Sequence, residues 1–253
     1  MSNTGLSIII IARNEERDIE ACLASVKDIA DEIILVDSGS TDRTLEIAGR
    51  FTGKIYRNEW KGYSAQKQFA LDKAKGPWVL NIDADERVPA ALREEINAVL
   101  ENNAGAQFHG YEIPFNHYFM GKRLRFGGVQ GETHIRLFFK QNASYGKESV
   151  HEGIRIDGRV GCLRHSIDHQ SYRDVRDYLE KCNEYTSAIA QKKWDAGKRF
   201  HPWHHFRLPF EFFVRYFLKL GFLDGGPGLT YALLSSYYAW LKFLKLKDFE
   251  VKI

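Results

Sequence analysis

The chain has 253 residues, of which 44% are hydrophobic and 27% charged, and its formal net charge is +3 at pH 7. This length and composition suit one α/β domain with an appendage, or two small domains, and exclude disorder on a large scale. Its three cysteines, Cys22, Cys162 and Cys182, form no CxxC pair and no pattern with paired histidines, which argues against a disulfide framework or structural zinc and for a reducing cytoplasm.

Charge is distributed unevenly along the chain. Between residues 191 and 253, eleven Lys and Arg oppose five Asp and Glu, so this segment carries +6 and the rest of the chain −3. A basic segment of this kind is typical of proteins that bind nucleic acid or an anionic membrane surface. The apolar run from Leu6 to Ala12 has no basic region before it and is followed by "RNEE", so it predicts a first strand and not a signal peptide.

Strands and helices are expected to alternate over the first hundred residues. Hydrophobic periodicity and turn residues predict strands at 6–12, 32–36, 54–58 and 78–82, and helices at 14–28, 41–51, 63–74 and from Pro89 onward. This alternation indicates right-handed βαβ units and a largely parallel sheet. Ligands of such sheets bind beyond the carboxyl ends of the strands, so Asp37 and Asp83 are expected to converge on one cleft.

The pattern changes after about residue 107. The segments 108–119, 134–140 and 143–156 are short, aromatic and strand-like, with glycine-rich turns, which favours β-hairpins over βαβ units. A helix is predicted to restart within 171–194, where Val175, Leu179 and Cys182 share one face.

The stretch "WVLNIDADERV", residues 78–88, places Asp83, Asp85 and Glu86 directly after a buried strand. Carboxylate oxygens are the ligands that hard cations such as Mg²⁺ prefer, and these cations keep positions open for substrate phosphates. An acidic helix start is the alternative, for Glu86 above all. Arg87 and Val88 exclude an EF-hand loop, and Arg87 also departs from the pattern of aspartate-nucleophile phosphatases.

A second candidate site joins "IIARNEE" and "VDSGSTD", the loops after the first two strands. Their carboxylate and amide groups can hydrogen-bond to a nucleobase edge, which leaves the D-x-D end for a diphosphate. Helix capping by Asn14 and Asp42 is the alternative. The chain has neither a Walker loop nor a GxGxxG motif after the first strand.

The motifs "LSIIIIARNEE", "EIILVDSGSTDRT" and "WVLNIDADE" resemble the nucleotide-sugar half of family 2 glycosyltransferases, which are inverting enzymes of the GT-A fold. "RLFF", "VHEGI" and "RYFLKLGFLDG" resemble the lipopolysaccharide core β-glucosyltransferase branch. The resemblance implies an α/β GT-A domain with a Rossmann-like mixed sheet over residues 1–170. Its nucleotide-sugar half covers about 1–106 and its acceptor half about 107–170, and a helical amphipathic extension follows over 171–253.

Site residues are carried over from this resemblance by position. It implies a divalent metal, Mg²⁺ or Mn²⁺, bound by Asp85, Asp83 and His169. It implies nucleotide contacts from Ala12, Arg13, Asn14, Glu15, Asp37, Ser38, Gln66, Asp83, Ala84 and Arg136. Ordinary roles stay open for two of these residues, since His169 precedes an expected helix start and a lone arginine such as Arg136 can simply solvate a strand.

An inverting displacement needs one general base near the acceptor hydroxyl. The candidate is Glu152 of "VHEGI", which lies beside His151 in a polar segment. Many family members have a Glu-Asp pair here, whereas Gly153 follows Glu152 in this chain. A surface ion pair of Glu152 with Arg155 or Lys147 is the alternative.

The C-terminal quarter combines apolar bulk with basic charge. In residues 207–223, Glu211, Arg215 and Lys219 form one narrow polar stripe, and Gly225–Leu241 has no charge over seventeen residues. Seventeen is at the lower limit for a membrane span, so helices lying in an anionic membrane interface are expected, with packing on the core or on a second subunit as the alternative. Basic residues interleaved with bulky aliphatic residues argue against nucleic acid.

These features predict an inverting transfer of a hexose, glucose from UDP-glucose, to a lipid-linked saccharide acceptor of the lipopolysaccharide inner core. The enzyme would be cytoplasmic, peripheral on the inner membrane, and able to form oligomers through its C-terminal helices. The alternatives are a peptide or protein glycosyltransferase of the same fold, a D-x-D metal-dependent phosphohydrolase, and a non-catalytic membrane adaptor.

Overall fold

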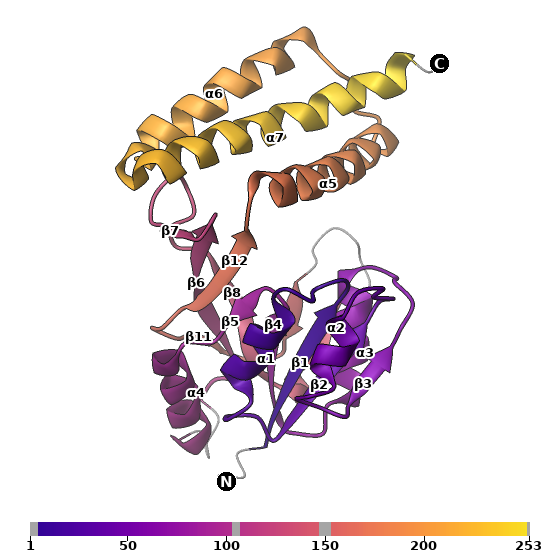
Figure 1. Cartoon of the computed structure of the whole chain (residues 1–253), viewed down its shortest axis with the longest axis vertical. Helices are drawn as coiled ribbons and strands as arrows, with labels where there is room; N and C mark the ends of the chain where they lie inside the picture. The colour runs from indigo at the N-terminus through magenta and orange to yellow at the C-terminus, as the bar shows by residue number, and fades with distance from the viewer. Residues whose placement is uncertain (1–4, 103–106, 147–152, 252–253) are drawn as a thin grey trace. The chain divides into compact units, whose positions relative to one another are not determined.

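The computed structural model describes residues 5–102, 107–146 and 153–251 and divides the chain into two compact units. The first unit consists of the chain up to Phe115 together with Gly131–His169. The second consists of Asn116–Gln130 together with the chain from Gln170 onward. The first is built on a mixed sheet, and the second is mainly helical (Figure 1).

Four parallel strands form the N-terminal half of the sheet in the order β3-β2-β1-β4. They are β1 (Leu6–Ala12), β2 (Glu32–Asp37), β3 (Ile55–Arg57) and β4 (Trp78–Asp83), and the helices that connect or follow them are α1 (Ile19–Val26), α2 (Thr44–Ala48), α3 (Tyr63–Lys73) and α4 (Ala90–Asn102). The predicted alternation is confirmed. The first helix begins five residues later than predicted, because Asn14 has φ 58° and cannot continue a right-handed helix.

The rest of the sheet is largely antiparallel, as expected for the chain beyond residue 107. It contains β8 (Thr133–Phe139), β6 (Gly110–Phe119), β12 (Ile167–Tyr172) and β5 (Glu86–Arg87), with β7 (Lys122–Leu124) and β11 (Val160–Cys162) beside β6, while β9 (Ala143–Tyr145) and β10 (Ile154–Ile156) pair separately. β8 runs antiparallel to β4 and joins the two halves. The predicted α/β class with a Rossmann-like mixed sheet is therefore confirmed.

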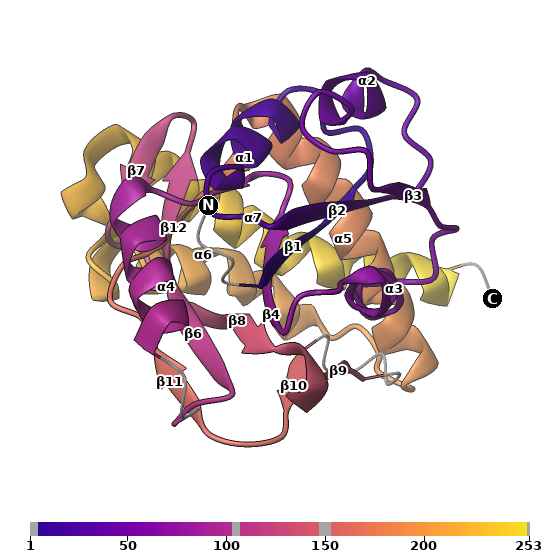
Figure 2. The same ribbon diagram turned by 90° about the horizontal axis from the view of Figure 1, so that it is seen from below.

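The sheet has an apolar core on each face because side chains alternate along every strand. Trp78, Leu80 and Ile82 of β4 belong to one core with residues of α1, α2 and α4, whereas Val79 belongs to the other core with residues of α3. Figure 2 shows α1 and α2 on one side of the parallel strands and α3 on the other. By the same alternation, Asp83 lies on the face that α3 covers.

The second unit contains three main helices, α5 (Val175–Asp195), α6 (Arg207–Phe213) and α7 (Gly225–Val251). A 3-10 turn (Pro202–Phe206) precedes α6, a π-helical turn (Val214–Leu218) continues it, and another 3-10 turn (Gly221–Asp224) leads into α7. α7 packs against both α5 and α6 (Figure 1). None of the helices in the described part of the chain combines the length and the apolar character needed to cross a bilayer.

Candidate functional site

The loops after β1 and β2 are tied together by hydrogen bonds between backbone amides and side chains. Asn14 N donates to Ser40 Oγ at 2.9 Å, and Thr41 N donates to Asn14 Oδ1 at 2.8 Å. Three more bonds join Glu15 N to Thr44 Oγ1, Glu16 N to Asp42 Oδ2, and Arg43 N to Glu16 Oε2. These bonds satisfy amides of both loops and hold the two loops against each other.

Neither of the two loop residues considered as helix caps is at an N-cap position, since Asp18 and Arg43 are the N-caps of α1 and α2. Asn14 does not cap α1, which begins at Ile19, and instead bonds to the neighbouring loop. Asp42 lies one residue before the N-cap Arg43, and its Oδ1 accepts from Thr44 N, the first residue of α2, at 3.0 Å. Burial opposes ionisation, but the bonds from Thr44 and Glu16 lower the pKa of Asp42 below its ordinary value.

Asp37 and Asp83 end the two strands that flank β1. Asp37 is level with Ala12 of β1, and Asp83 is level with Ile11, which confirms that both reach the same edge of the sheet. The Asp37 carboxylate is 1% exposed and accepts from Gly39 N at 3.0 Å and from Ser40 N at 3.1 and 3.2 Å. It therefore fixes the turn that follows β2.

Gln66 of α3 is completely buried below the same turn. Its Nε2 donates to Ser38 Oγ at 3.1 Å and to the carbonyl oxygens of Asn58 and Glu59 at 3.0 Å, while its Oε1 accepts from Asn58 Nδ2 at 2.7 Å. In this arrangement the Gln66 amide holds the loop between β3 and α3 against Ser38. Contact of Gln66 with a nucleotide stays a prediction.

A β-bulge directs Arg136 toward the end of β4. Tyr111 of β6 pairs with Leu137, but the next residue, Glu112, pairs with Ile135, so Arg136 is the extra residue on β8. Bulges re-aim side chains and are common beside functional sites. Here the bulge brings the Arg136 guanidinium to the carboxylates of Asp83 and Glu86 at the end of β4. The alternative that Arg136 simply solvates a strand is wrong, because this residue is 7% exposed.

Two cations and two carboxylates meet at the carboxyl end of β4. Arg136 Nη2 donates to Asp83 Oδ2 at 2.8 Å and also to Glu86 Oε1, while Lys67 Nζ of α3 lies 2.8 Å from Asp83 Oδ1. The Arg136 side chain is 9% exposed, and those of Lys67, Asp83 and Glu86 are 13%, 32% and 1% exposed. A buried charge needs such partners, because desolvation is otherwise very costly.

Protonation in this cluster follows from burial and charge. Burial opposes ionisation of Asp83, but Arg136 and Lys67 hold its pKa well below the usual range. Burial raises the pKa of Glu86 above its ordinary value, since the negative charge of Asp83 offsets part of the attraction of Arg136. Glu86 lies on β5, four residues before Ala90, the first residue of α4. Its buried ion pair shows that the helix-start interpretation was wrong for this residue.

Asp85 and His169 form a second pair beside the cluster. His169 Nε2 lies 3.4 Å from Asp85 Oδ2, and the two side chains are 26% and 19% exposed. Burial disfavours the charged imidazole, but the hydrogen bond and charge of Asp85 raise the pKa of His169 above its ordinary value. His169 belongs to β12, and the helix expected after it begins only at Val175.

This pair fits a divalent metal in part. A carboxylate suits Mg²⁺ or Mn²⁺, and histidine is a common metal ligand. Within the described ranges, no three His, Cys, Asp or Glu side chains form a group that could hold a metal ion. Asp83, expected as a third ligand, is held by Lys67 and Arg136 instead. Phosphate oxygens and water would have to supply the other positions, as is usual for Mg²⁺.

The other expected site residues differ in how far they are buried. Ala12 and Ala84 are 5% and 4% exposed, while Arg13 is exposed in the loop after β1. Glu152, the expected general base, lies outside the described residues.

Three residues of this region were not recognised as site residues from the sequence. Lys67 lies on a helix with no amphipathic pattern, and for Glu86 an acidic helix start was the alternative to a site role. Tyr145 of β9 is 7% exposed, and its hydroxyl has no hydrogen-bond partner among the described residues. Burial raises the pKa of this phenol, which interacts electrostatically with Arg136 and Asp83. The hydroxyl of a buried tyrosine usually has a hydrogen-bond partner, so this hydroxyl is available to form a hydrogen bond.

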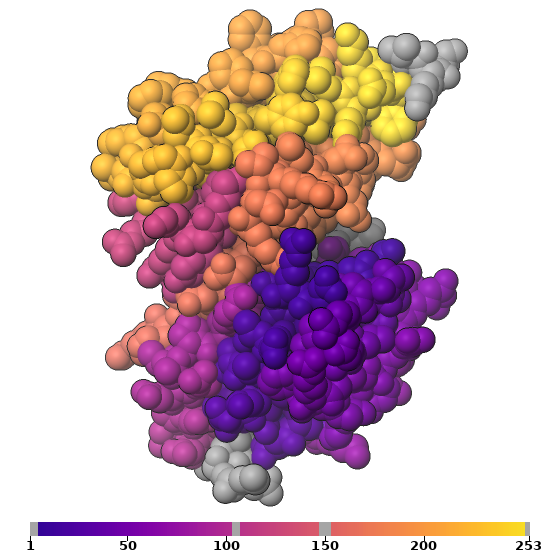
Figure 3. Space-filling view, viewed as in Figure 1, coloured from indigo at the N-terminus to yellow at the C-terminus, as the bar shows by residue number. Residues whose placement is uncertain are grey.

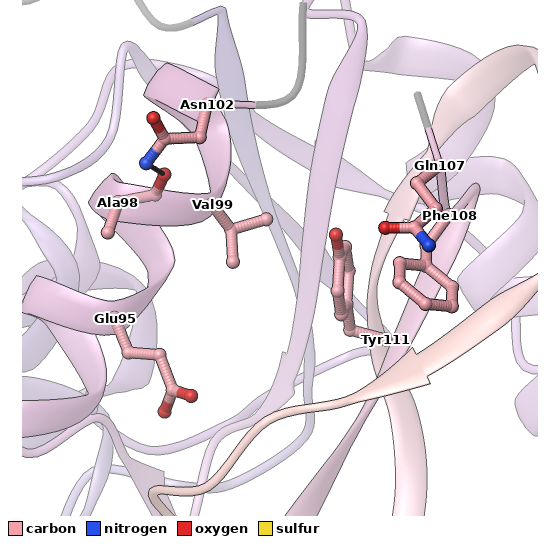
Figure 4. A pocket seen from close by; sticks show the side chains of 7 residues that line it. All are labelled: Glu95, Ala98, Val99, Asn102, Gln107, Phe108 and Tyr111. Atoms are coloured by element: carbon pink, nitrogen blue, oxygen red, sulfur yellow. Dashed lines mark hydrogen bonds between the residues drawn. The ribbon is translucent and has the colours of Figure 1, made fainter. Parts of the chain in front are cut away.

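A separate cavity of about 490 Å³ lies between α4 and β6 (Figure 4). Its lining residues are Glu95, Ala98, Val99, Asn102, Gln107, Phe108 and Tyr111. The ring of Tyr111 lies 6.2 Å from that of Trp78, which begins β4. The cavity is therefore near the amino end of β4, whereas Asp83 marks the carboxyl end, and none of the expected site residues lines it.

A Rossmann-like half-sheet with carboxylates and cations at its carboxyl edge is typical of enzymes that bind nucleotides there. The model of the family described as "Glycosyl transferase family 2" matches residues 7–168 of this chain. The chain therefore belongs to glycosyltransferase family 2, as its motifs predicted, and it is a glycosyltransferase.

Two relatives and one solved structure are similar to this chain. An uncharacterized glycosyltransferase of Rickettsia typhi is 30% identical over 260 residues, which cover 98% of this chain and 88% of the relative. The lipopolysaccharide core biosynthesis glycosyltransferase LpsC of Rhizobium meliloti is 32% identical over 249 residues, 95% of this chain and 91% of the relative. Glucosyl-3-phosphoglycerate synthase of Mycobacterium tuberculosis, in complex with Mn²⁺, UDP and phosphoglyceric acid, matches with a TM-score of 0.50 and 16% identity over 74% of this chain and 77% of its own. At that identity the likeness shows the fold alone.

Proposed function

We propose that this glycosyltransferase moves glucose from UDP-glucose to a sugar hydroxyl of the lipopolysaccharide inner core, with inversion at the anomeric carbon. Similarity to LpsC, named for lipopolysaccharide core biosynthesis, over 95% of this chain supports the acceptor class. The Mn²⁺ and UDP bound by the Mycobacterium tuberculosis synthase of similar fold support a UDP-linked donor and a divalent metal.

The observation that carries the donor site is the placement of Lys67 and Arg136 beside Asp83 at the carboxyl end of β4. A nucleotide sugar brings two phosphates, and its departing diphosphate must be neutralised as the glycosidic bond forms. Lys67 and Arg136 are within reach of one carboxylate, Asp83, so both point to one small volume. The loops after β1 and β2, already ordered by mutual hydrogen bonds, would receive the uridine.

The chemistry is a single displacement. The acceptor hydroxyl oxygen forms a bond to the anomeric carbon of glucose, the bond from that carbon to the diphosphate oxygen breaks, and UDP leaves. The hydroxyl proton goes to a general base, for which Glu152 remains the sequence-based candidate. A divalent metal held by Asp85 and His169 would add positive charge beside the diphosphate.

The acceptor is proposed to be a lipid-linked saccharide at the cytoplasmic face of an anionic inner membrane. This places the enzyme in the cytoplasm as a peripheral membrane protein. The basic character of residues 191–253, with net charge +6, supports attachment to anionic lipid. Contact between copies through the C-terminal helices is compatible with the same location.

The test is calorimetric titration of the purified protein with UDP and with UDP-glucose, with and without Mn²⁺ or Mg²⁺, followed by transfer assays on inner-core lipopolysaccharide acceptors. Metal-dependent UDP binding and glucose transfer to the glycolipid are expected. Absence of binding by any nucleoside diphosphate would contradict the donor site. Transfer to a peptide, but not to the glycolipid, would show that the acceptor is a peptide and not a lipid-linked saccharide.

A further inference from the structure

One helical face in the second unit is apolar and open to solvent. Trp203, Phe206, Phe210, Phe213 and Phe217 follow one another at intervals of three or four residues, the spacing of a single helical face. Their exposed fractions are 60%, 72%, 58%, 51% and 48%. We call these five residues the aromatic stripe. An apolar face of a helix in a globular protein normally packs on the core, so the orientation of this one is reversed.

Polar contacts on the opposite side fix this orientation. Arg215 Nε donates to Glu211 Oε1 at 2.9 Å, and both side chains are only about one-fifth exposed, at 21% and 20%. Arg215 Nη1 also donates to the carbonyl oxygen of Gly127 at 3.2 Å and to Tyr231 Oη at 3.4 Å. Two residues of the polar stripe recognised in the sequence therefore face inward, toward α7 and the 116–130 segment, while the aromatic side chains face outward.

Apolar exposure continues beyond the stripe into the next turn. Leu218, Leu220, Phe222 and Leu223 are 64%, 43%, 43% and 54% exposed. Figure 3 shows α5, α6 and α7 at the surface of the second unit in that view. Soluble monomers seldom expose contiguous apolar patches of this kind, and such patches mark sites of protein or membrane contact.

Charge around the stripe favours an anionic surface. The second unit has 17 Lys and Arg against 9 Asp and Glu. Its segment 116–130 has exposed Lys122, Arg123 and Arg125 and no acidic residue. Both carboxylates between residues 200 and 230 have internal partners, since Glu211 bonds to Arg215 and Asp224 Oδ2 accepts from Arg125 N and Phe126 N at 2.9 and 2.8 Å.

We propose that the aromatic stripe lies in the interface of an anionic lipid bilayer, with its rings among the headgroups and the first acyl carbons. A helix with one aromatic face, a basic surround and no capacity to span suits that position. A second copy of the chain fits less well, because two units that each carry net charge +8 repel each other. The inference gives the surface for the proposed membrane-bound acceptor and rests on that part of the proposed function.

The experiment is sedimentation of the full-length protein with vesicles of phosphatidylcholine, alone or with about 30% phosphatidylglycerol, a content at which anionic lipid gives a strong surface potential. The wild type should bind the anionic vesicles. The Phe206→Asp/Phe213→Asp variant should bind at least about tenfold more weakly, because two aromatic rings lose their burial in lipid. Both positions are exposed, so the fold should persist, and circular dichroism checks this.

A matched control replaces two apolar residues that are exposed on α5. Val175 and Leu179 are 46% and 43% exposed, and the Val175→Asp/Leu179→Asp variant should bind vesicles like the wild type. Equal vesicle binding by the stripe variant and the wild type would overturn the inference. So would a wild-type dimer that the stripe variant makes monomeric, with no vesicle binding by either.

UDP titration of the same samples separates this inference from the donor assignment. The stripe variant should bind UDP with wild-type affinity, since its substitutions lie outside the unit that contains Asp83 and Asp85. Vesicle binding without UDP binding would refute the donor site and leave the stripe intact. UDP binding without vesicle binding would refute the role of the aromatic stripe and leave the donor site intact.

Discussion

Arg136 joins an accessible carboxylate to a buried one. Its Nη2 donates to Asp83 Oδ2 at 2.8 Å and to Glu86 Oε1, and the side chains of the two acids are 32% and 1% exposed. Burial opposes its charge, but Asp83 and Glu86 raise the pKa of Arg136 above its usual value. The guanidinium is therefore a permanent cation, and it keeps both carboxylates at the carboxyl end of β4 compensated.

Replacing Arg136 by methionine should destabilise the fold strongly. The substitution keeps much of the side-chain volume but leaves Glu86 in the interior without its cation. Removing one partner of a buried ion pair lowers the free energy of unfolding by about 3–5 kcal/mol. Urea unfolding at pH 7 should show a loss of this size in the free energy of unfolding.

The control for this prediction adds Glu86→Gln to the Arg136→Met variant. A neutral amide is less costly to bury than a carboxylate, so the double variant should recover part of the lost stability. An Arg136→Met variant as stable as the wild type would contradict the compensating role of the guanidinium.

Lys67 should contribute to donor binding more than to stability. Its side chain is 13% exposed, its Nζ lies 2.8 Å from Asp83 Oδ1, and Asp83 keeps its contact with Arg136 when Lys67 is lost. Lys67→Met should weaken UDP binding about tenfold, which is about 1.4 kcal/mol. Lys73→Met is the matched control on the same helix. Lys73 lies over the rings of Tyr56 and Phe69, so this variant should leave the UDP affinity unchanged. Equal affinities in both variants would remove Lys67 from the site.

The strand ends that form the site could be predicted from the sequence. Not all of the side chains that converge there could be predicted. Buried runs end at Asp37 and Asp83, and the parallel registers bring both to one edge. Arg136 is directed by a bulge that depends on the pairing of β6 with β8. Pairing across twenty or more residues leaves no trace in local periodicity, so neither the bulge nor the burial of Glu86 could be read from the chain.

The same limit applies to the C-terminal helices. The polar stripe of Glu211 and Arg215 could be recognised from its spacing, but spacing does not say which face of a helix packs inward. Arg215 finds Gly127 O and Tyr231 Oη, partners that come from distant parts of the chain. The inward polar face, and with it the exposure of the aromatic stripe, became visible only with the tertiary contacts.

Asp85 and His169 should be needed for the metal-dependent part of UDP binding. If they supply two metal ligands, Asp85→Asn should reduce the enhancement of UDP affinity by Mn²⁺ at least about tenfold. Loss of a residue that only hydrogen-bonds to a metal ligand already lowers metal affinity about tenfold or more. Calorimetric titration with UDP at several Mn²⁺ concentrations measures this. Asp72→Asn, at an exposed position of α3, is the control. Unchanged metal dependence in Asp85→Asn would refute the assignment.

Glu152 should affect turnover without affecting donor affinity. A general base takes the acceptor proton in the transition state and contributes about 10²- to 10⁴-fold to the rate. Glu152→Gln should therefore lower kcat by about that factor and leave the Kd for UDP unchanged. Glu132→Gln, at an exposed position beside β8, is the control. A Glu152→Gln variant with normal kcat would assign the proton transfer to another group.

Glu32 should make the stability of the first unit depend on pH at the amino edge of the sheet. Its carboxylate accepts from Ser7 Oγ at 2.5 Å, from Lys75 N at 2.5 Å and from Lys54 Nζ, so it ties β1, β2 and the turn before β4. Burial opposes ionisation, but the bonds from Lys54, Ser7 and Lys75 lower the pKa of Glu32 from 4.5 to about 2. Because the folded pKa is the lower one, this stabilisation is complete above pH 4.5 and is lost as the pH falls toward 2.

Urea unfolding of Glu32→Gln measures that contribution. At pH 7 the variant should be less stable than the wild type by about 2 kcal/mol, a value reduced for solvent screening because Lys54 is 40% exposed. The difference should shrink between pH 4.5 and 2, since the wild-type carboxylate then becomes protonated in the folded state. Glu46→Gln, which removes an exposed pair with Arg43, should show no comparable loss at pH 7. A stability difference that stays constant from pH 7 to 2 would mean that the Glu32 side chain acts through its shape and not through its charge.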